Sequence, residues 1–196
     1  VHSKTASLIY GIDIEDVKYD HRRVAKIINY SIAYGAGPFR ISQELKISIK
    51  EASNIITNYF ERYPGIKKYI EDTIKQGLDN GFVSTILGRQ RNTINLRATN
   101  RNIQEAEKRA TINMPIQGTA SELIKVAMIK IFTKMSKYNL KSKMILQIHD
   151  ELLFETPENE KDKIINLVVK EMESAIELDV PIKVDYNFGK NWYEAH

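Results

Sequence analysis

Apolar residues recur at helical spacing along most of this sequence, and that periodicity restricts the fold more than any other feature. Ser48-Ile49-Lys50-Glu51 has the pattern of a capping box, in which a serine and a glutamate bond the first free backbone groups of a helix. The apolar residues that follow share one helical face, at Ala52, Ile55, Ile56, Tyr59 and Tyr63. The spacing predicts a helix over residues 49–63, which Pro64 and Gly65 would end.

Further helices and a smaller number of strands are expected along the rest of the chain. Helical spacing continues at about residues 66–78, 100–112, 119–135 and 157–178. A break is expected near Pro115, and Thr119–Glu122 has the pattern of a second capping box. Apolar and β-branched runs predict strands at about 82–87, 91–96, 144–148, 152–154 and 182–188, the first two forming a hairpin with a basic tip. The fold class is therefore α+β, with helices and strands packed as one continuous unit.

Composition excludes several classes of protein. Hydrophobic residues make up 42% of the 196 and charged residues 28%, which is typical of soluble globular chains. We expect no membrane segment and a cytoplasmic location, since no apolar run approaches the ~20 residues that span a bilayer. The chain has no cysteine, so a metal would need carboxylate or histidine ligands. Its net charge of +4 permits a polyanionic partner.

The segment 22–35 is the most informative part of the sequence. At about 100° per residue, two cations and two tyrosines share one helical face, while the apolar residues share the opposite one. Cations one turn apart can bind successive phosphates, and an aromatic ring on the next turn can stack on a sugar or base, which would suit a nucleoside triphosphate. A solvated basic face with two amphipathic tyrosines explains the spacing equally well. The residues of the polar face are Arg22, Lys26, Tyr30 and Tyr34.

Two adjacent carboxylates lie between the apolar runs 144–148 and 152–154. Asp150 and Glu151 would repel each other at a turn unless a positive group shared the site, and Mg²⁺ prefers such oxygen ligands. The alternative is a polar hairpin turn in which Asp150 bonds the local backbone.

A third set of residues is basic and amide-rich. Such a run can follow a phosphate backbone, and asparagine or glutamine can reach minor-groove acceptors, although a solvated surface is the simpler interpretation. The set comprises Arg89, Arg91, Arg97, Arg101, Lys108 and Arg109, with Asn92, Asn95, Asn100, Asn102, Asn113 and Gln117 between or after them.

Taken in order, these segments resemble the C-terminal polymerase region of the family A DNA polymerases, of the bacterial DNA polymerase I type. RRVAKIINYSIAYG is similar to the family's motif B on the fingers, NMPIQGTASELIK to the helix that contacts the primer-template minor groove, and QIHDELLFE to motif C of the palm. VPIKVDYNFGKNWYEAH is similar to the family's C-terminus. The resemblance covers nearly the whole chain and implies a fingers-like part at about 15–115 and a palm part at about 116–196.

The resemblance also implies roles for single residues in nucleotidyl transfer. Arg22 and Lys26 would bind the phosphates of the incoming nucleotide, and Lys26 would protonate the leaving pyrophosphate. Tyr30 would stack beside its sugar and base, and Tyr34 would guard the insertion position. Asp150 and Glu151 would hold and support two catalytic Mg²⁺ ions. The residues expected to touch primer-template DNA are Arg109, Asn113, Gln117 and, at the primer terminus, His149.

Two departures from the family pattern are evident. Ser31 stands where the family usually has glycine after the motif B aromatic. The family's motif A, an Asp-Tyr-Ser-x-x-Glu-like strand that supplies the second metal-binding aspartate, has no counterpart in the sequence. We therefore expect a fragment of a longer polypeptide whose motif A, thumb and any exonuclease domain lie upstream, and expect the isolated chain to be inactive. The alternatives are a non-catalytic nucleic-acid-binding module or a structural polymerase subunit.

Overall fold

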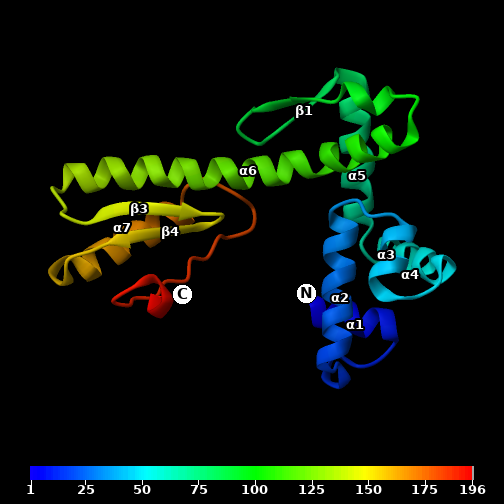
Figure 1. The fold of residues 1–196 in the computed structure, drawn as a ribbon, viewed down its shortest axis with the longest axis horizontal. Coiled ribbons are helices and arrows are strands. Elements are labelled where there is room, and N and C mark those ends of the chain that lie inside the picture. Colours follow the sequence, from blue (N-terminus) through cyan, green and yellow to red (C-terminus); the bar gives the residue numbers. More distant parts are fainter. Residues whose placement is uncertain (196) are drawn as a thin grey trace. The chain divides into compact units, whose positions relative to one another are not determined.

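The computed structural model describes residues 1–195 and divides the chain into two compact units, residues 1–118 and the part from Thr119 onward. Figure 1 shows both units and the long helix α6 that belongs to each in part. The mixture of helices with two separate antiparallel hairpins confirms the α+β class. The first unit holds α1 (His2–Tyr10), η1 (Ile14–Asp16), α2 (Tyr19–Ala33), α3 (Pro38–Leu45), α4 (Ile49–Arg62), α5 (Pro64–Asn80), β1 (Phe82–Ser84), β2 (Gln90–Asn92), η2 (Ile94–Arg97) and the start of α6 (Arg101–Lys137).

The core of the first unit is formed by α2, α3 and α4. Ile28 and Ile32 of α2 pack with Ile41 of α3 and Tyr59 of α4, and all four are buried. The apolar face predicted for α2 is thus the packed one. The predicted capping box of α4 is also confirmed, since the Glu51 backbone N–H donates to the Ser48 hydroxyl at 3.2 Å and the Glu51 carboxylate accepts from the Ser48 N–H at 2.8 Å.

The predicted break near Pro115 is wrong, because α6 continues through this proline to Lys137, and Thr119–Glu122 starts no helix. Proline has no N–H to donate, and its ring crowds the preceding turn at a cost of about 3 kcal/mol. Burial of residues before and after Pro115 offsets this cost, since Ile112 and Thr119 are less than 10% exposed. The Tyr69 hydroxyl also donates to the Ile112 carbonyl at 2.9 Å, so tertiary packing outweighs the local signal.

The predicted basic hairpin exists but is shorter than expected. β1 pairs with β2 in antiparallel register, and the predicted second strand ends at Asn92 because residues 94–97 form the 3₁₀ helix η2. The buried Thr93 hydroxyl donates to the Gly77 carbonyl of α5 at 2.7 Å, which turns the chain away from the strand direction. A Cβ on Gly77 would lie 2.9 Å from Leu96 Cδ1, so the absence of a side chain there allows η2 to pack on α5.

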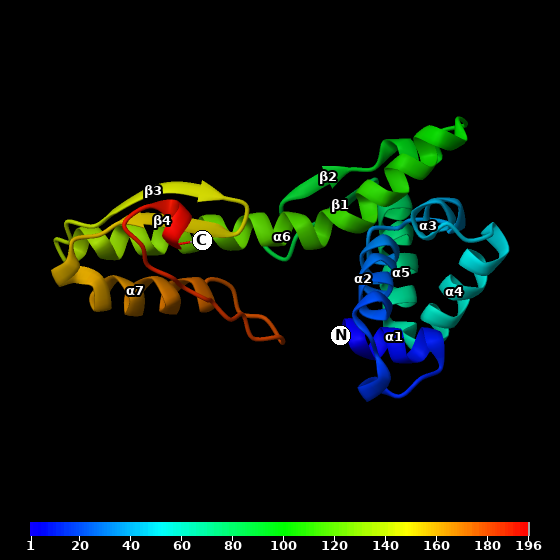
Figure 2. The ribbon, with the colours of Figure 1, turned by 60° about the horizontal axis from the view of Figure 1, so that its bottom comes forward.

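The second unit consists of an antiparallel hairpin and helices. It contains the end of α6, β3 (Lys143–Ile148), β4 (Glu151–Glu155), η3 (Glu158–Glu160), α7 (Lys161–Glu173) and α8 (Trp192–Ala195). Figure 2 shows α7 and the hairpin lying alongside the C-terminal half of α6. Ile131 of α6 packs with Ile164 and Leu167 of α7 in the buried core of this unit. The predicted strand pair is confirmed, with Ile148 opposite Glu151 and a bulge between Met144 and Leu146.

Two other boundaries in this unit differ from the prediction. The last predicted helix ends at Glu173 rather than near residue 178, and the last predicted strand, 182–188, is not formed. A strand needs a neighbour that pairs with its backbone, but the Val184 N–H instead donates to the Glu173 carboxylate at 3.2 Å. Among residues 1–195 no helix is long and apolar enough to cross a membrane.

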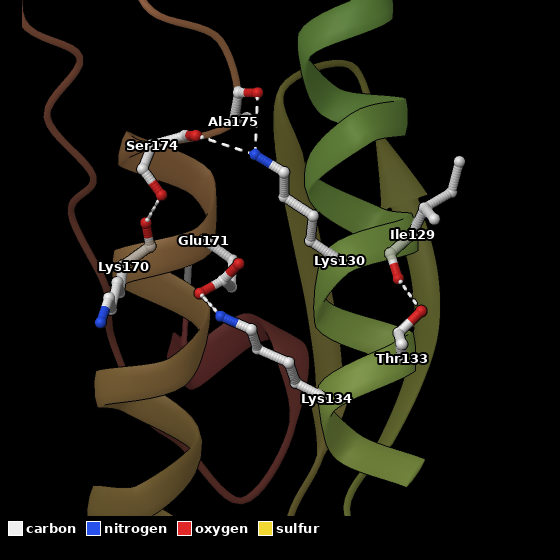
Figure 3. A network of polar contacts seen from close by, with 8 residues as sticks. All are labelled: Ile129, Lys130, Thr133, Lys134, Lys170, Glu171, Ser174 and Ala175. Carbon is white, nitrogen blue, oxygen red and sulfur yellow. Dashed lines mark hydrogen bonds and ion pairs between the residues drawn. The ribbon is translucent and has the colours of Figure 1, made fainter. Parts of the chain in front are cut away.

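Two lysines of α6 fix the C-terminal end of α7, as Figure 3 shows. Lys130 Nζ donates to the carbonyl oxygens of Ser174 and Ala175 at 3.0 and 3.1 Å, so a cation satisfies carbonyls that the helix end leaves free. Lys134 pairs with Glu171, whose side chain is only 6% exposed. The lysine therefore neutralises a carboxylate that is held away from water.

Lys134→Ala should lower the free energy of unfolding by about 1–3 kcal/mol, because the buried Glu171 carboxylate loses its charged partner. Lys137→Ala, which removes an exposed lysine from the last turn of the same helix, should change it far less. Urea unfolding of the 196-residue chain compares the two variants. Equal losses would show that the Lys134–Glu171 pair does not stabilise the fold.

Candidate functional site

The polar face predicted for α2 is exposed in the structure. The rings of Tyr30 and Tyr34 are stacked, with centroids 6.2 Å apart and planes inclined by 15°. Lys26 Nζ lies 6.0 Å from the centroid of the Tyr30 ring. The two tyrosine side chains are about half exposed, and Arg22 is also exposed. The face thus offers cations and aromatic surface to a ligand while the opposite face holds the helix in the core.

A groove of about 620 Å³ runs along this face and is lined by residues of α2, α3 and α6 and the α2–α3 connection. It brings together most of the residues predicted to bind nucleotide and DNA, although Arg23 lines it in place of Arg22. The predicted residues that line it are Lys26, Tyr30, Tyr34, Arg109, Asn113 and Gln117. Residues almost 80 positions apart in the sequence therefore form one surface.

Gly35 allows α2 and α6 to approach each other at the end of this groove. Its φ of +73° lies in the left-handed region, and a Cβ there would lie 3.3 Å from both Arg109 Cγ and Ile112 Cδ1. Asn113 Nδ2 donates to the Tyr34 carbonyl at 3.4 Å across the same contact. The position of Tyr34 relative to Asn113 is thus fixed by backbone geometry as well as by packing.

A polar network beside the Tyr30 ring was not among the features expected from the sequence. The His2 ring lies 5.7 Å from the Tyr30 ring, and His2 Nδ1 is 3.0 Å from Asn29 Nδ2. Asn29 is buried and also bonds the buried Thr5 hydroxyl. Burial, together with the positive charge of Arg22, lowers the pKa of His2. A buried asparagine on an otherwise apolar helix face was the available signal, because such a residue needs polar partners.

A second missed group joins α2 to α3. The Ser31 hydroxyl donates to Glu44 Oε2 at 2.8 Å, and Arg40 Nε donates to Glu44 Oε1 at 3.0 Å. These two bonds, that from Arg40 first, lower the pKa of Glu44. All three residues line the groove.

The predicted carboxylates occupy the turn of the β3–β4 hairpin in the second unit. His149 adopts a positive φ of 51°, and its carbonyl accepts from Gln147 Nε2 at 2.7 Å. Asp150 and Glu151 are exposed, and within residues 1–195 the Asp150 carboxylate bonds no other residue. An exposed pair of hard oxygen donors suits Mg²⁺, but residues 1–195 contain no cluster of three or more carboxylate or histidine side chains that could hold a metal ion.

Several cations of the basic segment have partners inside the protein. Arg91 pairs with the buried Glu107, and Lys108 pairs with Glu105 at 2.8 Å. A guanidinium nitrogen of Arg97 donates to the Leu78 carbonyl at 2.7 Å. Part of this segment is therefore structural, whereas Arg109 lines the groove.

Comparison with known proteins gives consistent matches over the whole chain. The sequence profile described as DNA polymerase family A matches residues 1–194. DNA polymerase I of Caldicellulosiruptor bescii is 46% identical over 195 residues, and that of Lactococcus lactis subsp. lactis is 45% identical over 196; each match covers 100% of this chain but only 23% and 22% of the relative. The solved POL domain of Pol1 from M. smegmatis, in complex with DNA primer-template and dNTP, matches with a TM-score of 0.93 and 40% identity, covering 99% of this chain and 34% of that one.

Proposed function

Because this chain belongs to DNA polymerase family A, we propose that it forms the fingers and part of the palm of a DNA-directed DNA polymerase that works in the cytoplasm. The chain spans less than a quarter of the length of the curated relatives named above, so the activity is that of a longer polypeptide. The observation that carries the proposal is the groove. It joins Lys26, Tyr30 and Tyr34, which are proposed to bind nucleotide, to the α6 residues proposed to bind DNA.

In this proposal, α2 holds the incoming deoxynucleoside triphosphate. Arg22 and Lys26 bind its phosphates, and Lys26 also donates a proton to the leaving pyrophosphate. Tyr30 lies against the sugar and base, and Tyr34 guards the position of the templating base. The stacked rings and the neighbouring ammonium group support this assignment, because they present aromatic surface beside positive charge.

The α6 residues of the groove contact the primer-template duplex. Arg109 neutralises a backbone phosphate, and the amide groups of Asn113 and Gln117 reach minor-groove acceptors that all base pairs share. His149, at the hairpin turn of the second unit, lies at the primer terminus in this proposal. Such contacts favour a paired duplex without selecting its sequence.

Asp150, supported by Glu151, is proposed to hold the catalytic Mg²⁺ ions. Its carboxylate is exposed and bonds no other residue within residues 1–195, so both of its oxygens can coordinate a cation. Bound Mg²⁺ would stabilise the attacking primer 3′-hydroxyl and the leaving oxygen during attack on the α-phosphate. A further aspartate is needed from motif A, in another part of the polypeptide.

Exposed apolar side chains of the second unit support a longer polypeptide. Ile129 and Phe132 of α6 are each 67% exposed, and Ile145 and Leu146 of β3 are also exposed. Ile129 and Phe132 lie three residues apart and so share one face of α6, and an exposed apolar face usually packs on another protein segment. We propose that upstream parts of the same polypeptide, including the rest of the palm, cover them.

The isolated 196-residue chain should not extend a primer, because a two-metal centre requires more carboxylates than Asp150 and Glu151 provide. Primer extension is measured with this chain and with the complete polypeptide, each beside its Asp150→Ala variant. We expect template-dependent extension by the complete polypeptide and none by the isolated chain. Extension by the isolated chain above its variant would overturn the proposed division of the metal site. A complete polypeptide that binds DNA without extending it would instead support a non-catalytic binding module.

The isolated chain should still bind duplex DNA weakly and with strong salt dependence, because its cations release counterions from phosphates. Fluorescence anisotropy between low and moderate salt measures the slope. Arg109→Gln should reduce the slope by about one, the share of one phosphate contact. A flat salt response would remove the basic segment and Arg109 from the DNA interface.

A further inference from the structure

Ser31 occupies the position at which family A members usually carry glycine, and its hydroxyl makes a hydrogen bond that glycine could not make. Ser31 is 9% exposed on α2 and donates to Glu44 Oε2 at 2.8 Å. The other oxygen of the same carboxylate accepts from Arg40 Nε at 3.0 Å. The serine thus connects a fixed point of the core to an arginine on the neighbouring helix α3.

This connection determines how firmly Arg40 is held. An exposed arginine–glutamate pair four residues apart on a helix contributes little by itself, because both side chains lose freedom when they pair. The Arg40 side chain is 68% exposed, and the Glu44 side chain is 34% exposed. A hydrogen bond from the buried Ser31 hydroxyl fixes the carboxylate, and the fixed carboxylate restricts the guanidinium.

The bond through Nε leaves Arg40 able to bind an anion. A guanidinium carries five N–H groups, so the four on its terminal nitrogens stay available for the oxygens of a phosphate. Arg40 lines the groove together with Arg23, Lys26 and Arg109, and Glu44 is the only acidic residue among the lining residues of the described chain. The surroundings of Arg40 are therefore positively charged and contain the stacked tyrosines, which is the combination that binds single-stranded nucleic acid.

We propose that Ser31 is a positioning residue that acts through Glu44 to hold Arg40 against a backbone phosphate of the unpaired template strand. The proposal rests on the proposed function, since that function supplies the strand. Phosphates of the incoming nucleotide have the same chemistry, but Lys26 and Arg22 of α2 are assigned to them. Arg40 lies on a different helix, and a strand that extends beyond the nucleotide would reach it.

The first test compares primer-templates that carry one or eight unpaired template nucleotides. The complete polypeptide is titrated by fluorescence anisotropy at several salt concentrations. Wild type should bind the longer overhang about 3- to 10-fold more tightly, and Arg40→Gln should remove most of this difference and lower the salt slope by about 0.7. Arg62→Gln, which removes another exposed positive charge from the end of α4, should keep both the overhang preference and the salt slope of wild type. Equal behaviour of the two variants would overturn the site.

The second test isolates the role of Ser31. Ser31→Ala removes no charge, yet it should lower the salt slope for the long overhang toward that of Arg40→Gln, because the guanidinium is no longer held in place. Ser31→Thr, which keeps the hydroxyl, should restore the slope. A merely structural role would alter stability without altering the number of phosphates neutralised, so an unchanged slope in Ser31→Ala would overturn the positioning role.

The Michaelis constant for the nucleotide, measured at saturating DNA, separates the two sources of phosphate. In Arg40→Gln this constant should stay within about twofold of wild type. If the constant rises tenfold or more while the overhang effect is unchanged, Arg40 binds the nucleotide and the proposal is overturned. Primer extension by wild type reports on the proposed function independently. An overhang effect that depends on Arg40 and Ser31 supports this inference even if the enzyme does not extend a primer. If the enzyme extends a primer but shows no such overhang effect, this inference is wrong and the proposed function still stands.

Discussion

Replacement of Asp150 by alanine should lower turnover of the complete polymerase by orders of magnitude while DNA affinity stays nearly unchanged. The carboxylate lies at the exposed turn between β3 and β4 and bonds no other residue within residues 1–195, so its loss should disturb the fold little. A metal ligand acts mainly in the transition state, where charge develops on the attacking and leaving oxygens. Single-turnover incorporation and anisotropy measure the two quantities separately.

Asp162→Ala provides the matched control for this experiment. Asp162 is an exposed aspartate in the first turn of α7, in the same unit as Asp150. Its removal changes the net charge equally and should leave turnover near that of wild type. A loss of DNA affinity in Asp150→Ala proportional to its loss of turnover would contradict the metal role and indicate a binding role.

The second large effect is expected at Tyr30, where family members carry phenylalanine or tyrosine. The family resemblance implies that the phenolic hydroxyl can occupy the space near C3′ of the nucleotide and replace the missing 3′-hydroxyl of a dideoxynucleotide. Within residues 1–195 the Tyr30 hydroxyl bonds no other residue, and the side chain is 48% exposed, so the hydroxyl is available. We expect weak discrimination against dideoxynucleotides in wild type. Tyr30→Phe should restore their rejection by about 10²-fold or more, roughly 3 kcal/mol.

Competition of a dideoxynucleotide against its normal counterpart measures this discrimination. Tyr19→Phe is the control, because Tyr19 begins the same helix, is 78% exposed and does not line the groove. Its incorporation ratio should equal that of wild type. The same ratio in Tyr30→Phe would mean that the hydroxyl does not act at the sugar, and it would weaken the placement of Lys26 and Tyr34 on the same face.

The elements that the sequence predicted well are those with local causes. The α4 capping box depends on two residues three positions apart, and the exposed face of α2 follows from residues spaced four apart. The continuous α6 could not be predicted in this way, because Pro115 is a local break signal that long-range burial and the bond from Tyr69 outweigh. The absent strand at 182–188 has the same origin, since strand formation depends on a partner that the pattern does not identify.

In the candidate site, too, the sequence predicted features with local causes but not contacts between distant elements. Each set of groove residues had a recognisable pattern, but only the fold brings Tyr34 to Asn113 and encloses both in one groove. Ser31 departs from the family pattern, yet its partner Glu44 lies on another helix at no characteristic spacing. Hydrogen bonds between elements are set by tertiary geometry, and the sequence therefore offered no account of the Ser31–Glu44–Arg40 connection.

The central claim is that the groove between α2 and α6 holds the nucleotide that pairs with the template. Photocrosslinking tests it most directly, with a deoxynucleoside triphosphate that carries a photoreactive group on its base, the complete polymerase, and a primer that lacks a 3′-hydroxyl. Trypsin cleavage after Lys26 and Arg40 would release residues 27–40, which contain Tyr30 and Tyr34. The account predicts that label enters this peptide and depends on a complementary template base. Label that lies outside this peptide and α6, or that is independent of the template base, would contradict it.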